Sequence, residues 1–470
     1  MHTITPPDSS EELGTIDLTD VAGVAGAIAA ARDAQRAWAR VPIRERAAAL
    51  DAAAAALEPE AEAMADLLSA ESGKPIAQAR FEIGGTIGLL RGNAEEARRL
   101  VGRVLPTEGN AGTEDDLAVT RREPLGVVGV ILPFNFPAEL FVEKCAAALV
   151  AGNAVVAKPP LDAPLTIGRI QAALVRGGVP AEILALVQGG ADVGAALASG
   201  DGIAAVSLTG STAAGVAVAE AAAPTLRKLH LELGGNNACI VLADADLDLA
   251  VAEIVSGRLM MNGQACSATK RVIVAESLHD ELAERLAAAA AGQRVGPSRE
   301  EETTVGPLIN PDAAERVAAQ VGGAIADGAE LIAGSERPDG AYFPPAVLRS
   351  VPATTAIARS EEIFGPVFNL IPVADADAAI AVANASDYGL MGSVFSGDLP
   401  LAWAIAERLE CGGVVINGSD NYRPPVIPFG GVKMSGTGRE GLGYTIEELS
   451  REKTIVLRRF RDSTAPRLAP

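Results

Sequence analysis

The chain has 470 residues, 49% of them hydrophobic, a composition typical of a globular protein with two or more domains. Its net charge of −21 argues against nucleic acid or an anionic membrane as a partner, because both call for a basic patch. No run reaches the roughly 18 apolar residues of a membrane span, and the N-terminus does not resemble a secretory signal. The cysteines and histidines are scattered, so we expect a reduced, cytoplasmic protein without a metal site.

The chain begins with helical patterns and then changes rhythm. Apolar residues recur at helical spacing over 20–41 and 44–71, and "SGKP" interrupts the pattern at 72–75. From about residue 126, short apolar runs alternate with segments of helical length. This alternation predicts βαβ units and a parallel sheet covered on both faces. The predicted strands are 126–132, 153–158, 183–188, 204–208 and 227–233.

A second alternating series indicates a second α/β domain over about 235–449. Its predicted strands include 238–243, 270–275 and 412–417. Residues 116–126 and 453–460 alternate apolar and polar side chains, so we expect them to pair in a small sheet that leaves the domain body.

Polar side chains end several predicted strands, where open parallel sheets bind their ligands. Lys158 ends one strand, and "SLTGSTAAG" (207–215) follows another and opens a helix. This suits a phosphate, although the fingerprint GxGxxG is absent and an ordinary turn is the commoner explanation. Asn135 lies between prolines in "PFNFP", as a turn residue or as a fixed hydrogen-bond donor. Glu232 lies between two leucines in "LELGG", at the end of a predicted strand, either in an ion pair or as a general base in apolar surroundings.

Each cysteine is either a core residue or a catalytic nucleophile. Free cysteine is among the most buried residue types, so Cys145, Cys239 and Cys411 are interpreted as core residues. Cys266 lies among small residues in "NGQACSATK" and is either a core residue or a nucleophile. A thiol, an amide donor, a glutamate in apolar surroundings and a phosphate-binding sheet edge together suit acyl chemistry with a redox step.

Seven motifs of this chain resemble, in the same order, those of the aldehyde dehydrogenase superfamily. The resemblance extends from about residue 20 to 460. The motifs are "PFNFP", "AGNAVVAKPP", "LTGSTAAG", "LELGG", "GQACSA", "EEIFGPV" and "PFGGVKMSGTGREG".

The resemblance implies an α/β fold of the aldehyde dehydrogenase type. A Rossmann-type dinucleotide-binding domain is expected from residues 1–105 and 125–234, and a catalytic domain from 235–449. Segments 106–124 and 450–470 are expected to form a small protruding sheet for oligomerisation, which implies a homodimer or homotetramer.

The resemblance also assigns catalytic roles. Cys266 matches the nucleophile that attacks the aldehyde, and Asn135 matches the amide that forms the oxyanion hole with the Cys266 N–H. Glu232 matches the base that activates water to hydrolyse the thioester. Lys144 and Glu440 match a pair linked to proton movement, and structural support is an equal alternative for them.

NAD or NADP is the cofactor that the resemblance implies. Many members that prefer NAD carry a glutamate on the ribose hydroxyls at the position where this chain has Leu161. NADP is therefore admitted beside NAD, and dual use with a slight bias to NADP is expected. The residues matched to cofactor binding are Lys158, Gly194, Gly210, Ser211, Glu362 and Phe364.

The expected substrate is a small polar or anionic aldehyde, such as a semialdehyde or hydroxyaldehyde. "PFNFP" with Arg423 ahead of Phe429 is similar to the branch acting on lactaldehyde, phosphonoacetaldehyde and, without phosphorylation, glyceraldehyde 3-phosphate. Arg423 is either a carboxylate-binding residue at the mouth or part of a surface ion pair. Ala265, where phosphate-handling members often have arginine, makes a phosphorylated substrate less expected. The residues matched to the substrate side are Phe136, Glu143, Arg423 and Phe429.

Two other functions remain open at this point. A CoA-acylating member of the superfamily would release the acyl group to CoA, but such enzymes usually lack a glutamate at the position of Glu232. An inactive member with a binding role would have no need of the matched thiol, amide and glutamate.

Overall fold

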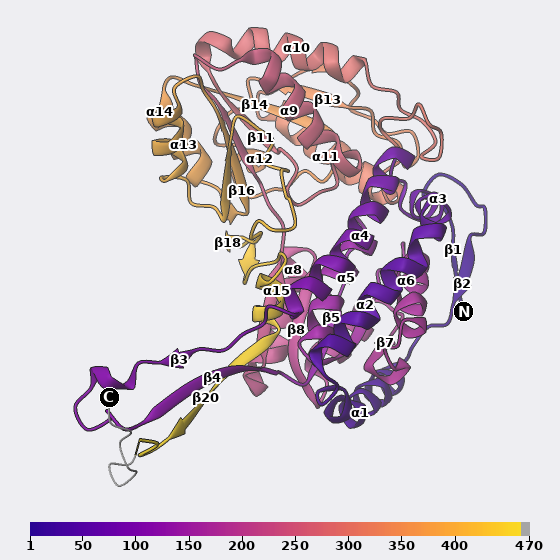
Figure 1. Cartoon of the computed structure of the whole chain (residues 1–470). Helices are drawn as coiled ribbons and strands as arrows, with labels where there is room; N and C mark the ends of the chain where they lie inside the picture. Colours follow the sequence, from indigo (N-terminus) through magenta and orange to yellow (C-terminus); the bar gives the residue numbers. More distant parts are fainter. Residues whose placement is uncertain (462–470) are drawn as a thin grey trace.

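The computed structural model describes residues 1–461, and these form two α/β bodies with an arm that leaves the first of them (Figure 1). Each body is built on one sheet whose strands are parallel except at one edge. No helix in the described part of the chain is long and apolar enough to cross a membrane. The α/β class and the parallel sheets expected from the alternating pattern are therefore confirmed.

The first sheet has six strands in the order β19-β9-β8-β5-β6-β7. Only β19 runs antiparallel to its neighbour. The chain fills one side from β5 to β7 and then crosses to β8 and β9, so the topological switch lies between β5 and β8. The strands are β5 (Val127–Ile131), β6 (Ala154–Lys158), β7 (Leu184–Leu186), β8 (Ile203–Thr209), β9 (Lys228–Glu232) and β19 (Gly436–Thr437).

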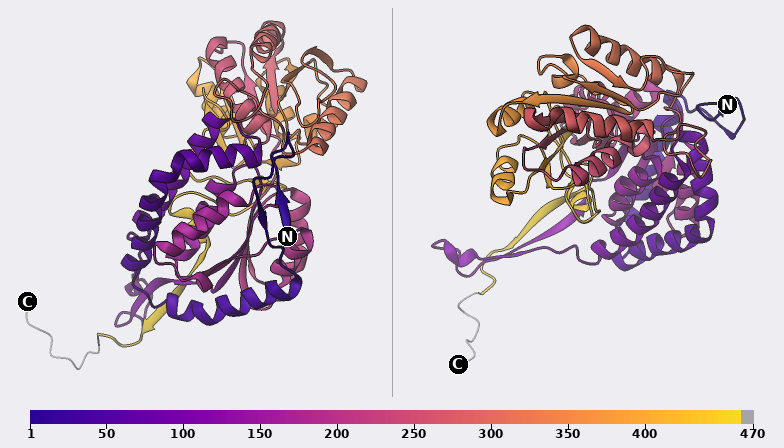
Figure 2. Two further views of the ribbon diagram at one scale, coloured as in Figure 1. Left: turned by 90° about the vertical axis from the view of Figure 1, so that its right-hand side faces the viewer. Right: turned by 90° about the horizontal axis from the view of Figure 1, so that it is seen from above.

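Helices cover both faces of this sheet (Figure 2). One layer contains α1 (Val21–Trp38), α7 (Ala191–Ser199) and α8 (Thr212–Ala222), which contact one another in sequence. The other layer contains α2 (Ile43–Leu57), α3 (Ala61–Ser72), α4 (Ile76–Ala97), α5 (Pro137–Val150) and α6 (Leu165–Arg176).

The second sheet has seven strands in the order β12-β13-β14-β11-β10-β16-β17. Side chains alternate between its faces: Ile240 joins one hydrophobic cluster and Val241 the other. The strands are β10 (Ala238–Val241), β11 (Arg271–Ala275), β12 (Glu330–Ala333), β13 (Ala346–Arg349), β14 (Val367–Val373), β16 (Met391–Phe395) and β17 (Gly413–Ile416). The helices are α9 (Leu247–Leu259), α10 (His279–Ala291), α11 (Pro311–Ala326), α12 (Ala356–Arg359), α13 (Ala376–Asn384) and α14 (Leu399–Ala406).

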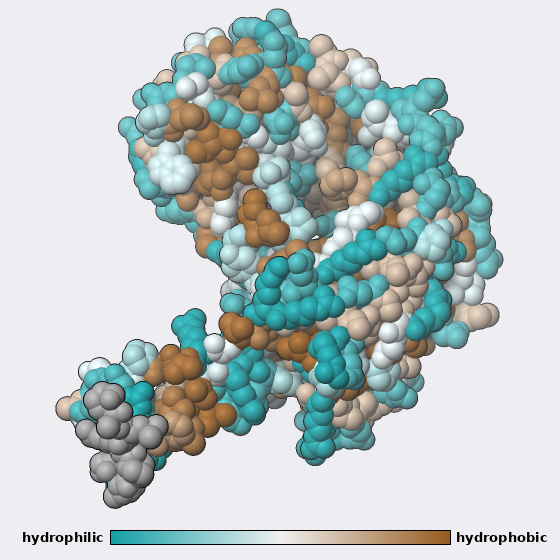
Figure 3. Space-filling model, viewed as in Figure 1, coloured by the Kyte–Doolittle hydropathy of each residue, from teal (hydrophilic) through white to brown (hydrophobic). Residues whose placement is uncertain are grey.

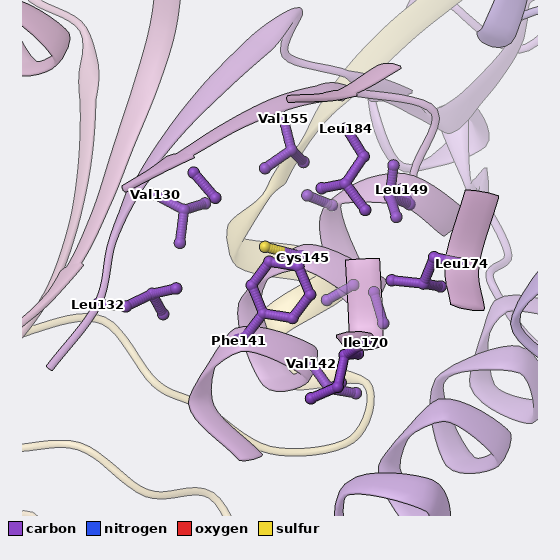
Figure 4. Close-up of a cluster of buried hydrophobic side chains, with 14 of the residues drawn as sticks. Val130, Leu132, Phe141, Val142, Cys145, Leu149, Val155, Ile170, Leu174 and Leu184 are labelled. Atoms are coloured by element: carbon purple, nitrogen blue, oxygen red, sulfur yellow. The ribbon is translucent and has the colours of Figure 1, made fainter. Parts of the chain in front are cut away.

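The core of the first body shows why Cys145 is structural. Its side chain is fully buried on α5 among apolar residues of the sheet and of α6 (Figure 4). Burial strongly raises the pKa of this thiol, so it stays protonated. Cys239 is equally buried, on β10.

The arm is a three-stranded sheet in the order β20-β4-β3. β20 (Ser450–Leu457) pairs antiparallel with β4 (Leu117–Pro124) along its whole length, as the alternating pattern predicts. β3 (Val104–Leu105) joins the other edge of β4. The end of the expected segment 450–470, from residue 462 onward, lies outside the described residues.

Four small features were not expected from the sequence. β1 (His2–Ile4) and β2 (Gly14–Ile16) form a hairpin at the N-terminus, and β15 (Tyr388–Gly389) pairs with β18 (Val432–Lys433). β19 lies within the segment 235–449 but hydrogen-bonds to β9 of the first sheet. α15 (Tyr444–Glu448), from the same segment, contacts α5. The end of that segment therefore packs on the first body.

A buried ion pair sets the start of α5, the helix that follows Asn135. Lys74 and Glu82 are both fully buried and contact each other directly. The second carboxylate oxygen of Glu82 accepts hydrogen bonds from the N–H groups of Ala138 (3.0 Å) and Glu139 (3.2 Å). Because these N–H groups belong to the first turn of α5, Glu82 satisfies donors that the helix itself cannot.

Removing Glu82 is expected to destabilise the protein strongly. In a Glu82→Ala variant the Lys74 ammonium is buried without a partner, and the free energy of unfolding should fall by about 3–5 kcal/mol. Urea denaturation measures this loss. The control is Glu62→Ala, which breaks the exposed contact of Glu62 with Arg80 and should cost far less. Equal losses in the two variants would contradict this account of α5.

Candidate active site

A deep cleft of about 570 Å³ opens at the carboxyl ends of β5, β6, β8 and β9. It lies at the topological switch between β5 and β8, which is where open parallel sheets bind their ligands. Segment 361–367 and the loop before β11 close the cleft from the second body. Eight of the predicted site residues line it: Asn135, Lys158, Gly210, Ser211, Glu232, Cys266, Glu362 and Phe364.

Cys266 lies on a tightly turned loop between α9 and β11. Asn262 and Gly263 both have positive φ angles, of 57° and 81°, in a short 3₁₀ turn over Met260–Gly263. A Cβ atom at Gly263 would lie 2.3 Å from the backbone of Gly365, so only glycine permits this approach. The backbone of the loop is therefore packed directly against the segment that carries Glu362 and Phe364.

Buried amides hold the backbone carbonyls of this loop. Asn135 donates from Nδ2 to the carbonyl of Gln264 at 2.9 Å, and Asn237 donates to those of Cys266 (2.8 Å) and Ala268 (3.0 Å). No acceptor among residues 1–461 contacts the Cys266 N–H. That N–H and the second Nδ2 hydrogen of Asn135 are thus available to an oxygen beside the thiol.

The Cys266 thiol and the Glu232 carboxyl line the same cleft, and each influences the pKa of the other. Glu232 is 2% exposed, and its Oε1 has no hydrogen-bond partner in the described part of the chain. Burial, reinforced by the neighbouring Glu440 carboxylate, raises the pKa of Glu232 to about 7. Burial and the same Glu232 charge raise the pKa of the thiol well above its usual value. The thiol therefore needs a base, and Glu232 is a carboxyl in the same cleft.

Glu440 has the opposite electrostatic environment. Burial alone would raise the pKa of its carboxyl, but Lys144 and Arg423 outweigh burial and lower it to about 2. Lys144 donates to one oxygen at 2.5 Å, and Arg423 donates to the other at 2.6 Å. The Arg423 guanidinium also stacks on Phe429, 3.9 Å from the ring centroid, and Phe429 belongs to a small apolar cluster against which Cys266 packs. Through Phe429, Arg423 therefore lies on the side of the site that contains the Cys266 thiol.

The cofactor-side residues occupy the edge of the first sheet. Lys158 is buried at the end of β6, and Ser211 caps α8 by accepting from the Ala214 N–H at 3.2 Å. Gly194 does not line the cleft; it lies behind Lys158, since a Cβ there would be 3.6 Å from the Lys158 Cδ. Leu161 does line the cleft, and so does Asp162, an acid that sequence reasoning did not weigh.

The structure corrects the substrate-side prediction for Glu143 and Phe136. Glu143 faces the segment that follows Glu440 instead of a funnel, because the register of α5 turns it inward. Its carboxylate is buried and accepts from the Gly441 N–H (2.8 Å) and from the Thr445 hydroxyl. Phe136 precedes the first turn of α5 and packs under the Lys74 ammonium, 3.8 Å from the ring centroid. Neither residue lines the cleft.

Sequence reasoning missed the polar residues that hold the site together. Asn237 fixes the nucleophile loop, and Lys270 bridges that loop to Glu362. Both lie close to recognised motifs, Asn237 just after "LELGG" and Lys270 just after "GQACSA". Polar residues at the entrance of a buried strand were the available signal, because a buried polar group must have a partner.

The chain is similar to known proteins along its whole length. The model of the Aldehyde dehydrogenase family matches residues 1–455. Glutarate-semialdehyde dehydrogenase of Pseudomonas putida is 36% identical over 97% of this chain and 94% of its own. The chain therefore belongs to the aldehyde dehydrogenase family.

Solved structures show the same fold. The NADP-dependent glyceraldehyde-3-phosphate dehydrogenase of Bacillus halodurans, complexed with NADP, is 37% identical with a TM-score of 0.93 and covers 97% of this chain and 95% of its own. The NAD-dependent aldehyde dehydrogenase of Sinorhizobium meliloti is 36% identical, also with a TM-score of 0.93, and covers 100% and 92%. Family membership places this chain among oxidoreductases that act on aldehydes with NAD or NADP.

The Asn237→Ala variant tests whether the hydrogen bonds from Asn237 to the Cys266 loop are needed for catalysis. Without the amide, the carbonyls of Cys266 and Ala268 lose their donor, the thiol shifts, and kcat should fall about 100-fold. The matched control is Asn236→Ala. Asn236 is equally buried but donates to Ile357, away from the loop, so its loss should affect stability more than kcat. Steady-state kinetics and thermal melts separate the effects on kcat and on stability. Equal losses of kcat in the two variants would refute the catalytic importance of the Asn237 hydrogen bonds.

Proposed function

We propose that this chain oxidises a small polar aldehyde to the carboxylic acid with NAD or NADP, through a covalent thioester on Cys266. The observation that carries the proposal is that one cleft holds both the Cys266 thiol and a buried carboxylate, Glu232, whose Oε1 has no hydrogen-bond partner in the described part of the chain. A nucleophile near a base that can accept its proton is the arrangement required for covalent catalysis.

The residues of the cleft suit a dinucleotide. Ser211 opens α8, whose N-terminal N–H groups and dipole favour phosphate, and Lys158 adds a positive charge. The Thr209 hydroxyl lines the same cleft and has no hydrogen-bond partner in the described part of the chain. Glu362 offers a carboxylate to ribose hydroxyls. When bound, the cofactor supplies the hydride acceptor.

The acylation half-reaction uses Glu232, Cys266 and Asn135. Glu232 accepts the thiol proton as the Cys266 sulfur attacks the carbonyl carbon and forms a thiohemiacetal. The Asn135 amide and the Cys266 N–H donate to the developing oxyanion. After hydride leaves the same carbon, a thioester remains on Cys266.

Hydrolysis of the thioester requires a base that can ionise near neutral pH. Glu232, with a pKa of about 7, accepts a proton from water as the water attacks the thioester carbon. Cys266 then leaves as the thiolate and recovers a proton. Because Glu232 is present and lines the same cleft as the thiol, hydrolysis to the free acid is favoured over acyl transfer to CoA.

Arg423 is the candidate for selecting an anionic end of the substrate. Its contact with Glu440 uses one edge of the guanidinium, and the side chain remains 24% exposed. Arginine has five N–H donors, so the free edge can bind a carboxylate on a semialdehyde. The semialdehyde relative reported above supports this choice of substrate class.

An aldehyde panel with NAD and NADP in parallel tests the proposed function. Cofactor reduction should be fastest with semialdehydes or hydroxyaldehydes, and Cys266→Ala should abolish it because the nucleophile is lost. Cys411→Ala is the control, since Cys411 is also partly exposed but lies outside the cleft. Turnover in the Cys266→Ala variant, or far better kcat/KM with long aliphatic aldehydes, would contradict the proposal.

The raised pKa of Glu232 predicts the pH dependence. The carboxylate must be ionised to act as a base, so kcat should fall about tenfold per pH unit as pH drops below the pKa of about 7. In Glu232→Gln, whose amide does not titrate, the profile should be low and flat over this range. Glu440, with a pKa of about 2, remains ionised throughout and adds no inflection. A wild-type profile flat from pH 5.5 to 8 would contradict the role of Glu232.

We also propose that the arm joins copies of this chain into a homodimer or homotetramer in the cytoplasm. Among residues 1–461, β20 is an edge strand with unpaired backbone groups along one side. Exposed apolar side chains cover the arm (Figure 3): Val101, Val104, Leu105, Ile455, Val456, Leu457 and Phe460. Such a patch favours association. All four cysteines are free, as expected of a reducing compartment.

Val456→Asp tests this interface. A charge on the outer strand of the arm should lower the mass measured by light scattering after size-exclusion chromatography. Phe81→Asp is the control, because Phe81 is more exposed than Val456 but lies on α4, away from the arm. A wild-type monomer, or an unchanged mass in Val456→Asp, would contradict the assignment of the arm.

A further inference from the structure

Lys270 is a fully buried cation that the proposed chemistry does not use. It follows the nucleophile loop, directly before β11, and its side chain is 0% exposed. Its ammonium donates to the carbonyl of Ala265 at 2.8 Å and to Glu362 Oε1 at 2.8 Å. It also lies 4.8 Å from the centroid of the Phe364 ring. An ammonium has three N–H donors, and here three acceptors surround it.

These three acceptors belong to the two halves of the site. The Ala265 carbonyl is one residue before the nucleophile, whereas Glu362 and Phe364 line the cofactor side of the cleft. Phe364 is held on another side by the edge of Phe134, at 6.0 Å between ring centroids. A single side chain thus joins the backbone beside the thiol to both residues matched to the nicotinamide ribose and ring.

The anchoring of Glu362 leaves one carboxylate oxygen for a ligand. Oε1 accepts from Lys270, while Oε2 lies beside Gly234, so close that a Cβ there would be only 2.5 Å away. Gly234 and Glu362 both line the cleft. Lys270 therefore determines which oxygen of Glu362 faces the ribose.

We propose that Lys270 is a positioning residue that sets the nicotinamide ribose site of Glu362 against the Cys266 loop. This inference rests on the proposed function. Lys270 touches neither substrate nor cofactor; it acts through Glu362 and Phe364. Its removal should therefore impair cofactor binding and hydride transfer while the thiol stays reactive.

The nucleophile loop has enough other anchors to survive the loss of Lys270. Asn237 holds the carbonyls of Cys266 and Ala268, and Asn135 holds that of Gln264. The buried guanidinium of Arg258 donates to the carbonyl of Thr269 at 3.1 Å. Glu362, in contrast, has Lys270 as the one cation within ion-pair distance in the described part of the chain.

The test compares Lys270→Met with wild type in two assays. Methionine keeps most of the apolar stem but lacks the charge. Calorimetric titration should show affinity for the preferred cofactor, NAD or NADP, reduced about tenfold or more, because Glu362 loses a charge-assisted hydrogen bond and can turn away. Cofactor-free hydrolysis of p-nitrophenyl acetate, which reports attack by Cys266, should stay within about threefold of wild type.

In Lys270→Met, Glu362 loses its cation, and the unpaired charge could prevent folding. A second pair of variants keeps the test valid in that case. Glu362→Gln and the charge-balanced double variant Lys270→Met/Glu362→Gln complete a double-mutant cycle. If Lys270 acts through Glu362, Lys270→Met should lower cofactor affinity by less than about twofold in the Glu362→Gln background.

The outcomes separate this inference from the proposed function. A wild-type protein that neither binds nor reduces NAD or NADP would refute the proposed function itself. A wild type that does both, with Lys270→Met binding cofactor equally well, would refute only the positioning role. A parallel fall of ester hydrolysis and cofactor affinity, or equal losses of affinity in both backgrounds, would also overturn it and leave Lys270 as general structural support.

Discussion

The backbone carbonyls of the nucleophile loop are held from behind by buried side chains, and the rest of the site depends on this. Asn135 binds the carbonyl of Gln264, and Asn237 binds those of Cys266 and Ala268. With these carbonyls turned into the protein, the Cys266 N–H has no hydrogen-bond acceptor among residues 1–461, and Cys266 lines the same cleft as Glu232. The same donors come from both bodies, so the two sheets must pack correctly before the loop takes this shape.

Charge placement gives two buried carboxylates different tasks. Glu440 lies between Lys144 and Arg423 and stays ionised, which makes it a permanent anchor for both cations. Glu232 has no ion-pair partner among the described residues, and burial beside another carboxylate keeps its pKa near 7. Identical side chains thus become a structural anion and a proton acceptor because their surroundings differ.

The sequence predicted the parts of this protein that follow from local pattern. Alternating apolar runs located the parallel strands, and the motifs around Cys266, Glu232 and Asn135 brought together residues that the structure places in one cleft. Contacts between distant segments were not visible in the pattern. Glu143 was expected in the funnel, but which way a helical residue faces depends on its register against a segment about 300 positions away. Lys270 and Asn237 were missed for the same reason.

Trapping the acyl-enzyme tests the central claim, a thioester on Cys266 that is hydrolysed with Glu232 as base. The wild-type protein is mixed with a semialdehyde and cofactor, quenched in acid within the first turnover, and mapped by mass spectrometry of its peptides. The peptide that contains Cys266 should carry the mass of the acyl group, with not more than one equivalent of reduced cofactor formed per site. Sustained turnover without an adduct, or an adduct on Cys145, Cys239 or Cys411 instead, would contradict the account.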